Sequence, residues 1–186
     1  IVLMGSSWGK DEELMKEAII KSKANFKLII APHEVHESHI EQILNLFPDA
    51  IKYSEAIKEE FDKNLNDCRI LIIDCIGILS SLYKYTTIAY IGGGFGVGIH
   101  NILEAATFGK PICFGINYKK FREAIDLVEK EGAFSINNSY ELIEIINKLL
   151  LDSNYYKKSS DICLEYIKEN TGACTRILSK INSIEE

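Results

Sequence analysis

A run of glycines followed by a histidine, an asparagine and a glutamate is the part of this sequence best suited to chemistry. Five glycines fall within residues 92–98, directly after the apolar run 88–91. Glycine leaves backbone amides open to a ligand, and the helix expected at residues 101–108 adds partial positive charge at its start. The pattern is typical of a site for a phosphate, a carboxylate or a ribose. The residues expected to bind such a ligand are Gly93, Gly94, Phe95, Gly98, His100 and Asn101.

Glu104 falls in the first turn of that expected helix. A carboxylate at this place either accepts hydrogen bonds from ribose hydroxyls or simply complements the positive helix end. We expect ribose binding, because so many glycines in one loop indicate close approach of a ligand. The loop does not match the G-x-G-x-x-G pattern of NAD sites, since Gly94 and Gly96 would require a glycine where Ile99 stands.

A second candidate loop, residues 5–11, follows the first apolar run. It superficially resembles a nucleotide-binding P-loop, but three residues instead of four separate Gly5 from Gly9, and Asp11 stands where a serine or threonine would hold magnesium. These mismatches argue against a P-loop. Ser6 is still expected to contact a phosphate, and the alternative is a tight turn with a helix cap.

Three further loops each supply one expected ligand residue, and each has a plainer alternative. His33, in residues 31–36, is expected to support a phosphate, or it is a surface histidine. Gly77, in residues 74–79, lets the backbone approach a base, and Asp74 beside it is a ligand contact or a cap. Asn117, in residues 114–121, is expected to recognise a sugar, whereas Lys119 and its neighbour read as solvated charges.

Composition limits the classes of function. The 186 residues suit one α/β domain, and the net charge of −6 argues against a nucleic-acid binder, which needs a basic face. The five cysteines are not spaced C-x-x-C, and His33 and His36 do not have the spacing of a helical metal site. We therefore expect no metal and no cofactor. No apolar run is long enough to span a membrane, so this chain is expected to be soluble.

Alternating apolar and amphipathic segments predict the fold. Strands are expected at residues 1–4, 26–31, 50–53, 70–73, 88–91, 111–114 and 133–135. Helices are expected at residues 10–24, 37–47, 78–85, 101–108, 121–131, 140–151, 153–169 and 174–184. This alternation predicts an α/β fold with a Rossmann-like, doubly wound parallel sheet. Ligands of such sheets bind at the carboxyl ends of the strands, where all five loops lie.

The first residue, Ile1, falls inside an expected strand and no initiator methionine precedes it. We therefore expect residues 1–186 to be one domain cut from a longer protein, with a part missing upstream.

Three strings carry a family resemblance: D-x-x-G-x-L-x-x-L-Y from Asp74 to Tyr83, G-G-G-F from Gly92 to Phe95, and G-I-H-N-I-L-E-A-A from Gly98 onward. Together with G-S-S-W and A-P-H-E, they resemble the C-terminal domain of 3-deoxy-D-manno-octulosonic acid (Kdo) transferases, which have the glycosyltransferase-B (GT-B) fold. One departure is Ile78, where the family carries a glutamate.

The resemblance implies a function for the whole protein. Its donor would be CMP-Kdo, bound by this domain without a metal, and its acceptor would be lipid IVA, the lipid A precursor, in lipopolysaccharide core biosynthesis. The acceptor and the general base would belong to the missing N-terminal domain, so this chain alone is expected to be inactive and to contain no catalytic residue. The full protein would associate peripherally with the cytoplasmic face of the bacterial inner membrane.

Two other readings stay open at this stage. One is a GT-B protein that uses a UDP-sugar, such as a MurG-like transferase or a UDP-GlcNAc 2-epimerase. The other is a Rossmann-like module without catalytic function, which would bind no nucleotide. A comparison of CMP binding with UDP binding distinguishes the three interpretations: a preference for CMP, a preference for UDP, or no binding of either nucleotide.

Overall fold

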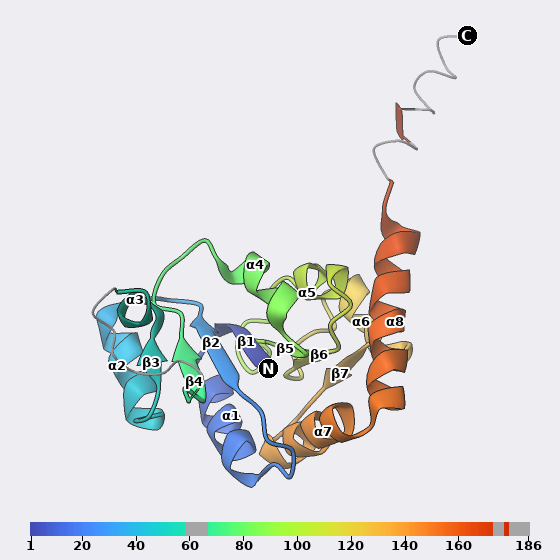
Figure 1. Ribbon diagram of the computed structural model, residues 1–186. Helices are drawn as coiled ribbons and strands as arrows, with labels where there is room; N and C mark the ends of the chain where they lie inside the picture. The colour runs from blue at the N-terminus through green and yellow to red at the C-terminus, as the bar shows by residue number, and fades with distance from the viewer. Residues whose placement is uncertain (59–66, 173–176, 179–186) are drawn as a thin grey trace.

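The structure is a computed structural model that describes residues 1–58, 67–172 and 177–178. Within these residues, seven parallel strands form one sheet in the order β3-β4-β2-β1-β5-β6-β7. The strands are β1 (Val2–Ser7), β2 (Leu28–Pro32), β3 (Ile51–Lys52), β4 (Ile70–Ile72), β5 (Ile88–Ile91), β6 (Ile112–Phe114) and β7 (Ala133–Ser135). The expected doubly wound parallel sheet is confirmed, with β1 and β5 at its centre (Figure 1).

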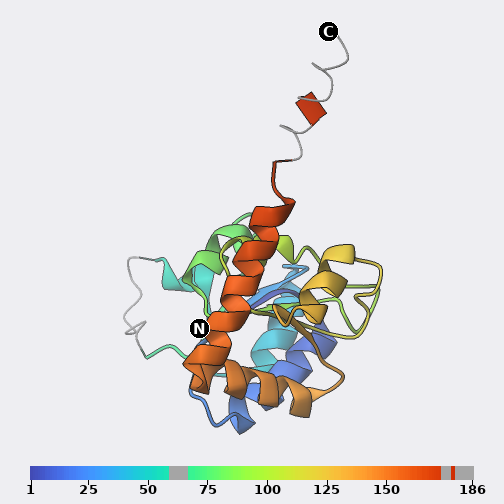
Figure 2. The ribbon, with the colours of Figure 1, turned by 90° about the vertical axis from the view of Figure 1, so that its right-hand side faces the viewer.

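Helices cover both faces of the sheet. They are α1 (Gly9–Lys21), α2 (Glu37–Leu46), α3 (Tyr53–Ala56), α4 (Leu79–Leu82), the 3₁₀ helix η1 (Tyr83–Tyr85), α5 (Leu103–Thr107), α6 (Arg122–Glu129), α7 (Ser139–Leu151) and α8 (Ser153–Asn170). In Figure 1, α4 and α5 lie above the sheet and α1 and α7 below it. Figure 2 shows α8 running along one side, where it packs against α5 and α7.

The buried apolar side chains form two clusters, one on each face of the sheet. Along β1 they alternate: Val2 and Met4 join the cluster beneath α1, α2 and α7, whereas Leu3 joins the cluster beneath η1, α5, α6 and α8. Parallel strands buried on both faces give continuous apolar runs, which is the pattern of Leu28 to Ile30. The same burial makes the strands easy to recognise in the sequence.

Several expected boundaries differ from the structure. Tyr53 does not end a strand but begins α3, because Asp74 from a distant loop accepts a hydrogen bond from the Ser54 amide (2.9 Å) and caps the helix. The helix expected at residues 78–85 is α4 followed by η1. The helix expected at residues 174–184 lies, apart from residues 177–178, outside the described part of the chain.

The helix start expected at Asn101 is also wrong, since α5 begins at Leu103. The Asn101 side chain explains the shift: its oxygen accepts a hydrogen bond from the Leu103 amide at 3.0 Å. Asparagine competes in this way with helical backbone bonds, so it precedes the helix instead of joining it.

Candidate functional site

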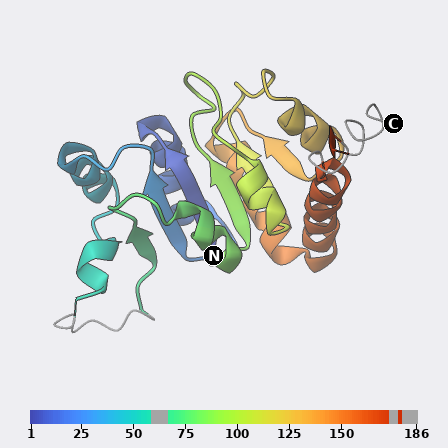
Figure 3. The same cartoon turned by 90° about the horizontal axis from the view of Figure 1, so that it is seen from above.

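The loops that carry the expected ligand residues meet at the carboxyl edge of the sheet. They follow β1, β2, β4, β5 and β6, and Figure 3 shows the loops after β5 and β6 projecting from the same edge. The order of strands reverses between β1 and β5, which is where open α/β sheets bind ligands. Residues 92–100, here called the glycine loop, follow β5 at this reversal.

Three glycines of the glycine loop are required by close backbone packing. A Cβ atom at Gly92 would lie 2.1 Å from the carbonyl oxygen of Ser6, and one at Gly94 would lie 2.5 Å from the amide nitrogen of Gly115. A Cβ at Gly93 would lie 2.4 Å from the Gly98 carbonyl oxygen. These glycines therefore join the loop to its neighbours, in addition to any role toward a ligand.

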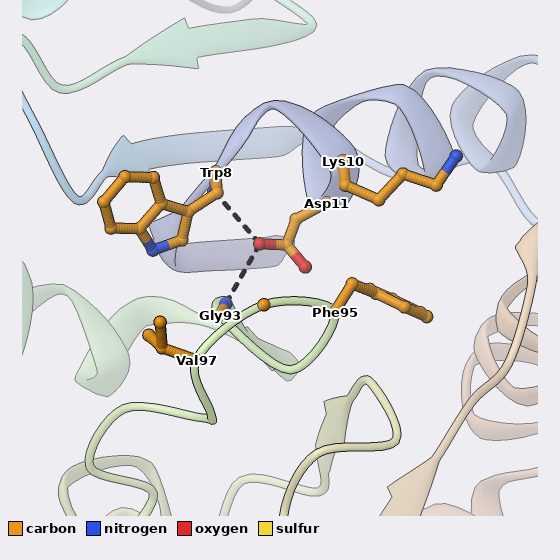
Figure 4. Close-up of a pocket in the computed structure, with 7 residues that line it drawn as sticks. Trp8, Lys10, Asp11, Gly93, Phe95 and Val97 are labelled. Atoms are coloured by element: carbon orange, nitrogen blue, oxygen red, sulfur yellow. Dashed lines mark hydrogen bonds between the residues drawn. The ribbon is translucent and has the colours of Figure 1, made fainter.

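The Asp11 carboxylate holds the glycine loop from the α1 side. It is 1% exposed and accepts hydrogen bonds from the Trp8 amide (3.0 Å), the Gly93 amide (3.0 Å) and the Tyr90 hydroxyl (2.7 Å). Figure 4 shows the carboxylate between Trp8 and Gly93. Burial, with the neighbouring carboxylate, raises the pKa of Tyr90, so this hydroxyl stays a donor. Sequence reasoning noted Asp11 only as a mismatch to a P-loop.

Bonds within the protein decide which amides of the loop are left for a ligand. The Gly93 amide is taken by Asp11, and the amides of Gly96 and Gly98 both donate to the Gly93 carbonyl. Among the described residues, no group accepts a hydrogen bond from the amides of Gly94, Phe95 and Val97. These three amides of the loop could therefore donate hydrogen bonds to an anion.

Asn117, in the loop after β6, holds the glycine loop from the other side. Its amide donates to the Gly94 carbonyl at 2.9 Å, and its side-chain nitrogen donates to the Gly96 carbonyl at 2.8 Å. The side-chain oxygen stays open to a ligand. Asn117 thus sets the shape of the loop whether or not it also contacts a sugar.

Three aromatic rings from three different loops stack at this edge. Trp8 and His33 have ring centroids 4.7 Å apart, and His33 and His100 are 4.4 Å apart. The His33 ring is exposed, whereas Trp8 Nε1 and His100 Nε2 are buried without a hydrogen-bond partner among the described residues. Burial, followed by the nearby His33, lowers the pKa of His100, and Asp11 opposes this shift. His100 is therefore neutral at neutral pH.

A pocket of about 220 Å³ opens between α1 and the glycine loop. Trp8, Asp11, Gly93, Phe95 and Val97 line it, and the Val97 side chain is 86% exposed. Lys10 also lines the pocket, and its ammonium group pairs with Glu13 at 3.2 Å (Figure 4). The spacing of Gly5 and Gly9 argues against a P-loop, and that remains a prediction from the sequence.

Glu104 stands half-buried in the first turn of α5, as expected. Its Oε1 accepts a hydrogen bond from the Asn101 side chain at 3.2 Å, while the oxygen of the same side chain caps Leu103. Asn101 therefore orients Glu104 and leaves further acceptor sites on its carboxylate for ligand hydroxyls.

The loop between β4 and α4 is more open. Gly77 has a φ of +93°, a conformation that glycine adopts more readily than other residues, and no atom lies within 4 Å of the position that a Cβ would take. Asp74 was expected to contact a ligand or to cap a helix. In the structure its carboxylate accepts hydrogen bonds from Ser54 and caps α3. Ile78 is half-buried against the apolar cluster of the η1 face, where the resembling family has a glutamate.

Ser6 occupies an irregular position at the end of β1. Its φ is +52°, which is unfavourable for serine, and the pairing between β1 and β2 shifts between Gly5 and Ser7. The Ser6 backbone contacts Gly92 as a result. Strained positions of this kind concentrate at functional sites.

A second buried carboxylate, Glu12, was missed by sequence reasoning. It is 1% exposed, accepts a hydrogen bond from the Ser7 hydroxyl at 2.9 Å and lies 3.1 Å from Nε2 of His39. Burial is the main cause that raises the pKa of Glu12. This group connects β1, α1 and α2 but does not contact the glycine loop. The only signal in the sequence was an acidic pair at the start of α1.

Comparison with known proteins identifies relatives of the chain. It is 28% identical to a 3-deoxy-D-manno-octulosonic acid transferase of Rickettsia conorii over 97% of this chain and 40% of the relative. It is 32% identical to the enzyme of the same name from Aquifex aeolicus over 80% of this chain and 41% of the relative. The chain thus spans about two fifths of the length of these relatives. No family model matches it.

Solved structures show the same fold. The C-terminal CMP-Kdo binding domain of WaaA from Acinetobacter baumannii superposes with a TM-score of 0.76 at 18% identity, covering 89% of this chain and 88% of that domain. Anabaena HepE, in complex with UDP and glucose, gives a TM-score of 0.64 at 14% identity, covering 98% of this chain and 48% of HepE. No helix among the described residues has the length and hydropathy needed to cross a membrane.

The resemblance expected from the motifs is confirmed: the chain is similar along most of its length to the Kdo transferases, and it has the fold of the C-terminal domain of a GT-B glycosyltransferase.

Proposed function

We propose that this chain is the donor-binding domain of a glycosyltransferase that transfers Kdo from CMP-Kdo to a lipid A precursor. The observation that carries the proposal is the glycine loop, which is hydrogen-bonded to Asp11 and Asn117 and precedes Glu104 at the point where the strand order reverses. The sequence similarity to Kdo transferases supports this choice of sugar and acceptor. The acceptor, the general base and contact with the cytoplasmic face of the inner membrane would belong to the rest of the longer protein.

The proposed role of the domain is to stabilise the leaving CMP. Negative charge grows on the phosphate as the bond to the sugar breaks, and donors fixed beforehand at that place lower the barrier. The amides of Gly94, Phe95 and Val97 are suited to the phosphate or the sugar carboxylate, together with the Ser6 hydroxyl. His33 extends the same surface from the loop after β2.

The proposed contacts to the nucleoside come from the segments that follow β4 and β5. Glu104, oriented by Asn101, accepts hydrogen bonds from ribose hydroxyls. Gly77 lets the cytosine lie close to the backbone after β4, because nothing occupies the space beside it. Gly98 and His100 shape the loop between these two groups of contacts.

Use of a UDP-sugar is the second candidate. Anabaena HepE, which has the same fold, binds UDP and glucose in its crystal structure. The two bases differ at their Watson–Crick edge, so the loop between β4 and α4 would decide between them.

Calorimetric titration of the chain with CMP, UDP and NAD tests the proposal. We expect CMP to bind at least about tenfold more tightly than UDP, which corresponds to about 1.4 kcal/mol. Glu104→Ala should weaken CMP binding, and Glu129→Ala, at an exposed position on α6, is the matched control. Preference for UDP would favour the second candidate, and absence of nucleotide binding would favour a module without catalytic function.

A further inference from the structure

Tyr83 is a buried tyrosine at the start of η1. The residue is 2% exposed and belongs to the apolar cluster of the η1 face, together with Leu3 and Ile102. Its backbone carbonyl accepts a hydrogen bond from the Thr86 hydroxyl at 3.0 Å, which fixes the end of η1. The side chain is therefore held in one place by packing.

The Tyr83 hydroxyl lies beside the last regular residue of β1. A Cβ atom at Gly5 would come within 2.6 Å of Tyr83 Oη and within 3.1 Å of the Leu79 side chain. Gly5 is thus a glycine because the tyrosine hydroxyl occupies that space. Gly5 also accepts a hydrogen bond from the Gly92 amide and precedes the strained Ser6, so the hydroxyl lies beneath two loops of the candidate site.

This hydroxyl has no hydrogen-bond partner among the described residues. The buried polar atoms that are both enclosed and unpartnered are Trp8 Nε1, Ser22 Oγ, His100 Nε2 and Ser159 Oγ. Tyr83 Oη is not one of them, so the small exposed part of this side chain includes its hydroxyl. A polar group in an apolar cluster that stays unpaired in the free protein is available to a ligand.

The surroundings of the Tyr83 hydroxyl, including the Glu104 carboxylate, keep it protonated. Burial first, and then the carboxylate of Glu104, raise the pKa of Tyr83. The phenol therefore stays protonated at neutral pH and acts as a hydrogen-bond donor. Glu104 is an acceptor, so the two side chains present complementary groups to a ligand that carries both hydroxyls and acceptor oxygens.

We propose that Tyr83 is a further residue that binds the nucleotide. Its hydroxyl donates a hydrogen bond to an oxygen of the phosphorylated ribose, the sugar ring of which lies beside Glu104. This role rests on the proposed function, because it requires a nucleotide at the carboxyl edge of β1. It explains why a tyrosine in an apolar cluster extends its hydroxyl toward Gly5 without a protein partner.

Tyr83→Phe tests the role, because it removes only the hydroxyl. We expect the variant to bind CMP about tenfold more weakly in calorimetry, which is within the range of one lost hydrogen bond in a largely dry site. Its midpoint of thermal unfolding should stay the same or rise, since no protein hydrogen bond is lost. A purely structural role would not separate affinity from stability in this way.

Tyr166→Phe is the matched control. Tyr166 belongs to the same cluster and is 7% exposed, but its hydroxyl is already bonded to Asp126 at 3.3 Å, away from the loops. Its variant should bind CMP as the wild type does. Equal CMP affinity of the wild type and Tyr83→Phe would overturn the role of Tyr83 alone. A wild type that binds no CMP would contradict the proposed function and this role with it.

Discussion

The loops after β1, β5 and β6 form a cross-connected group, whereas the loop between β4 and α4 stands apart. Asp11 and Asn117 bond to the glycine loop from opposite sides, and the rings of Trp8, His33 and His100 stack across it. By contrast, no described residue forms a hydrogen bond with Ile76 or Gly77, and the Ile76 side chain is 83% exposed.

The two regions correspond to two proposed functions of a nucleotide-sugar site, which are binding of the phosphate and recognition of the base. The connected loops lie where the phosphate is proposed to bind, and a preformed site loses less conformational entropy when it takes up its ligand. The open loop lies where the base is proposed to bind, which is the part that differs between CMP and UDP. A fold shared by many donors would thus keep the first region rigid and vary the second.

The largest expected effect is on the free energy of unfolding, and it comes from replacing one glycine in each of the two regions with alanine. Gly92→Ala places a Cβ 2.1 Å from the Ser6 carbonyl, so we expect a loss of about 3 kcal/mol or more in the free energy of unfolding. Gly77→Ala meets no atom within 4 Å and loses only about 1–2 kcal/mol, the cost of its positive φ. Urea denaturation measures both, and equal losses would contradict the division into two regions.

The next effect concerns the buried carboxylates Asp11 and Glu12. Asp11→Ala leaves the Trp8 and Gly93 amides and the Tyr90 hydroxyl without their acceptor, and we expect a loss of about 2–4 kcal/mol. Asp11→Asn keeps an acceptor oxygen in place and should lose about half as much.

Amide hydrogen exchange distinguishes Asp11 from its neighbour. Asp11→Ala should speed exchange at Gly93, because that amide donates to the carboxylate. Glu12→Ala should also destabilise the fold, through Ser7 and His39, but leave exchange at Gly93 at the wild-type rate once global unfolding is accounted for. Faster local exchange at Gly93 in both variants would show that Asp11 does not hold the loop specifically.

The smallest effect is a pH dependence of stability. His100 has a lowered pKa in the folded chain, so the unfolded chain binds a proton more readily. The stability from this group is present above the unfolded pKa of about 6.5 and is lost as the pH falls below it toward the folded value. We expect His100→Gln to reduce the loss of thermal stability between about pH 7.5 and 5.5. His36→Gln, at an exposed position, should leave the loss unchanged.

The sequence predicted the sheet and nearly all of its covering helices, because strands buried on both faces and amphipathic helices leave local patterns. The contacts of Asp11 with Tyr90 and Gly93 could not be predicted in the same way, since they join residues 79 and 82 positions apart. The α3 start at Tyr53 depends on Asp74, which lies 20 positions from Ser54 and so leaves no local signal either. The glycine loop was recognised, but its backbone packing against Ser6 and Gly115 appears only once the strands are adjacent.

Mapping of CMP binding by amide chemical shifts shows whether a nucleotide binds at the carboxyl edge of the sheet. We expect CMP to shift the amide signals of Gly94–Val97, Glu104 and Gly77, and we expect the Gly77 signal to differ most between CMP and UDP. The shifts of the apolar pocket between Ile1 and Arg69, which lies elsewhere on the chain, should stay unchanged. Shifts confined to that pocket, or none at the glycine loop, would contradict a nucleotide site at the carboxyl edge of the sheet.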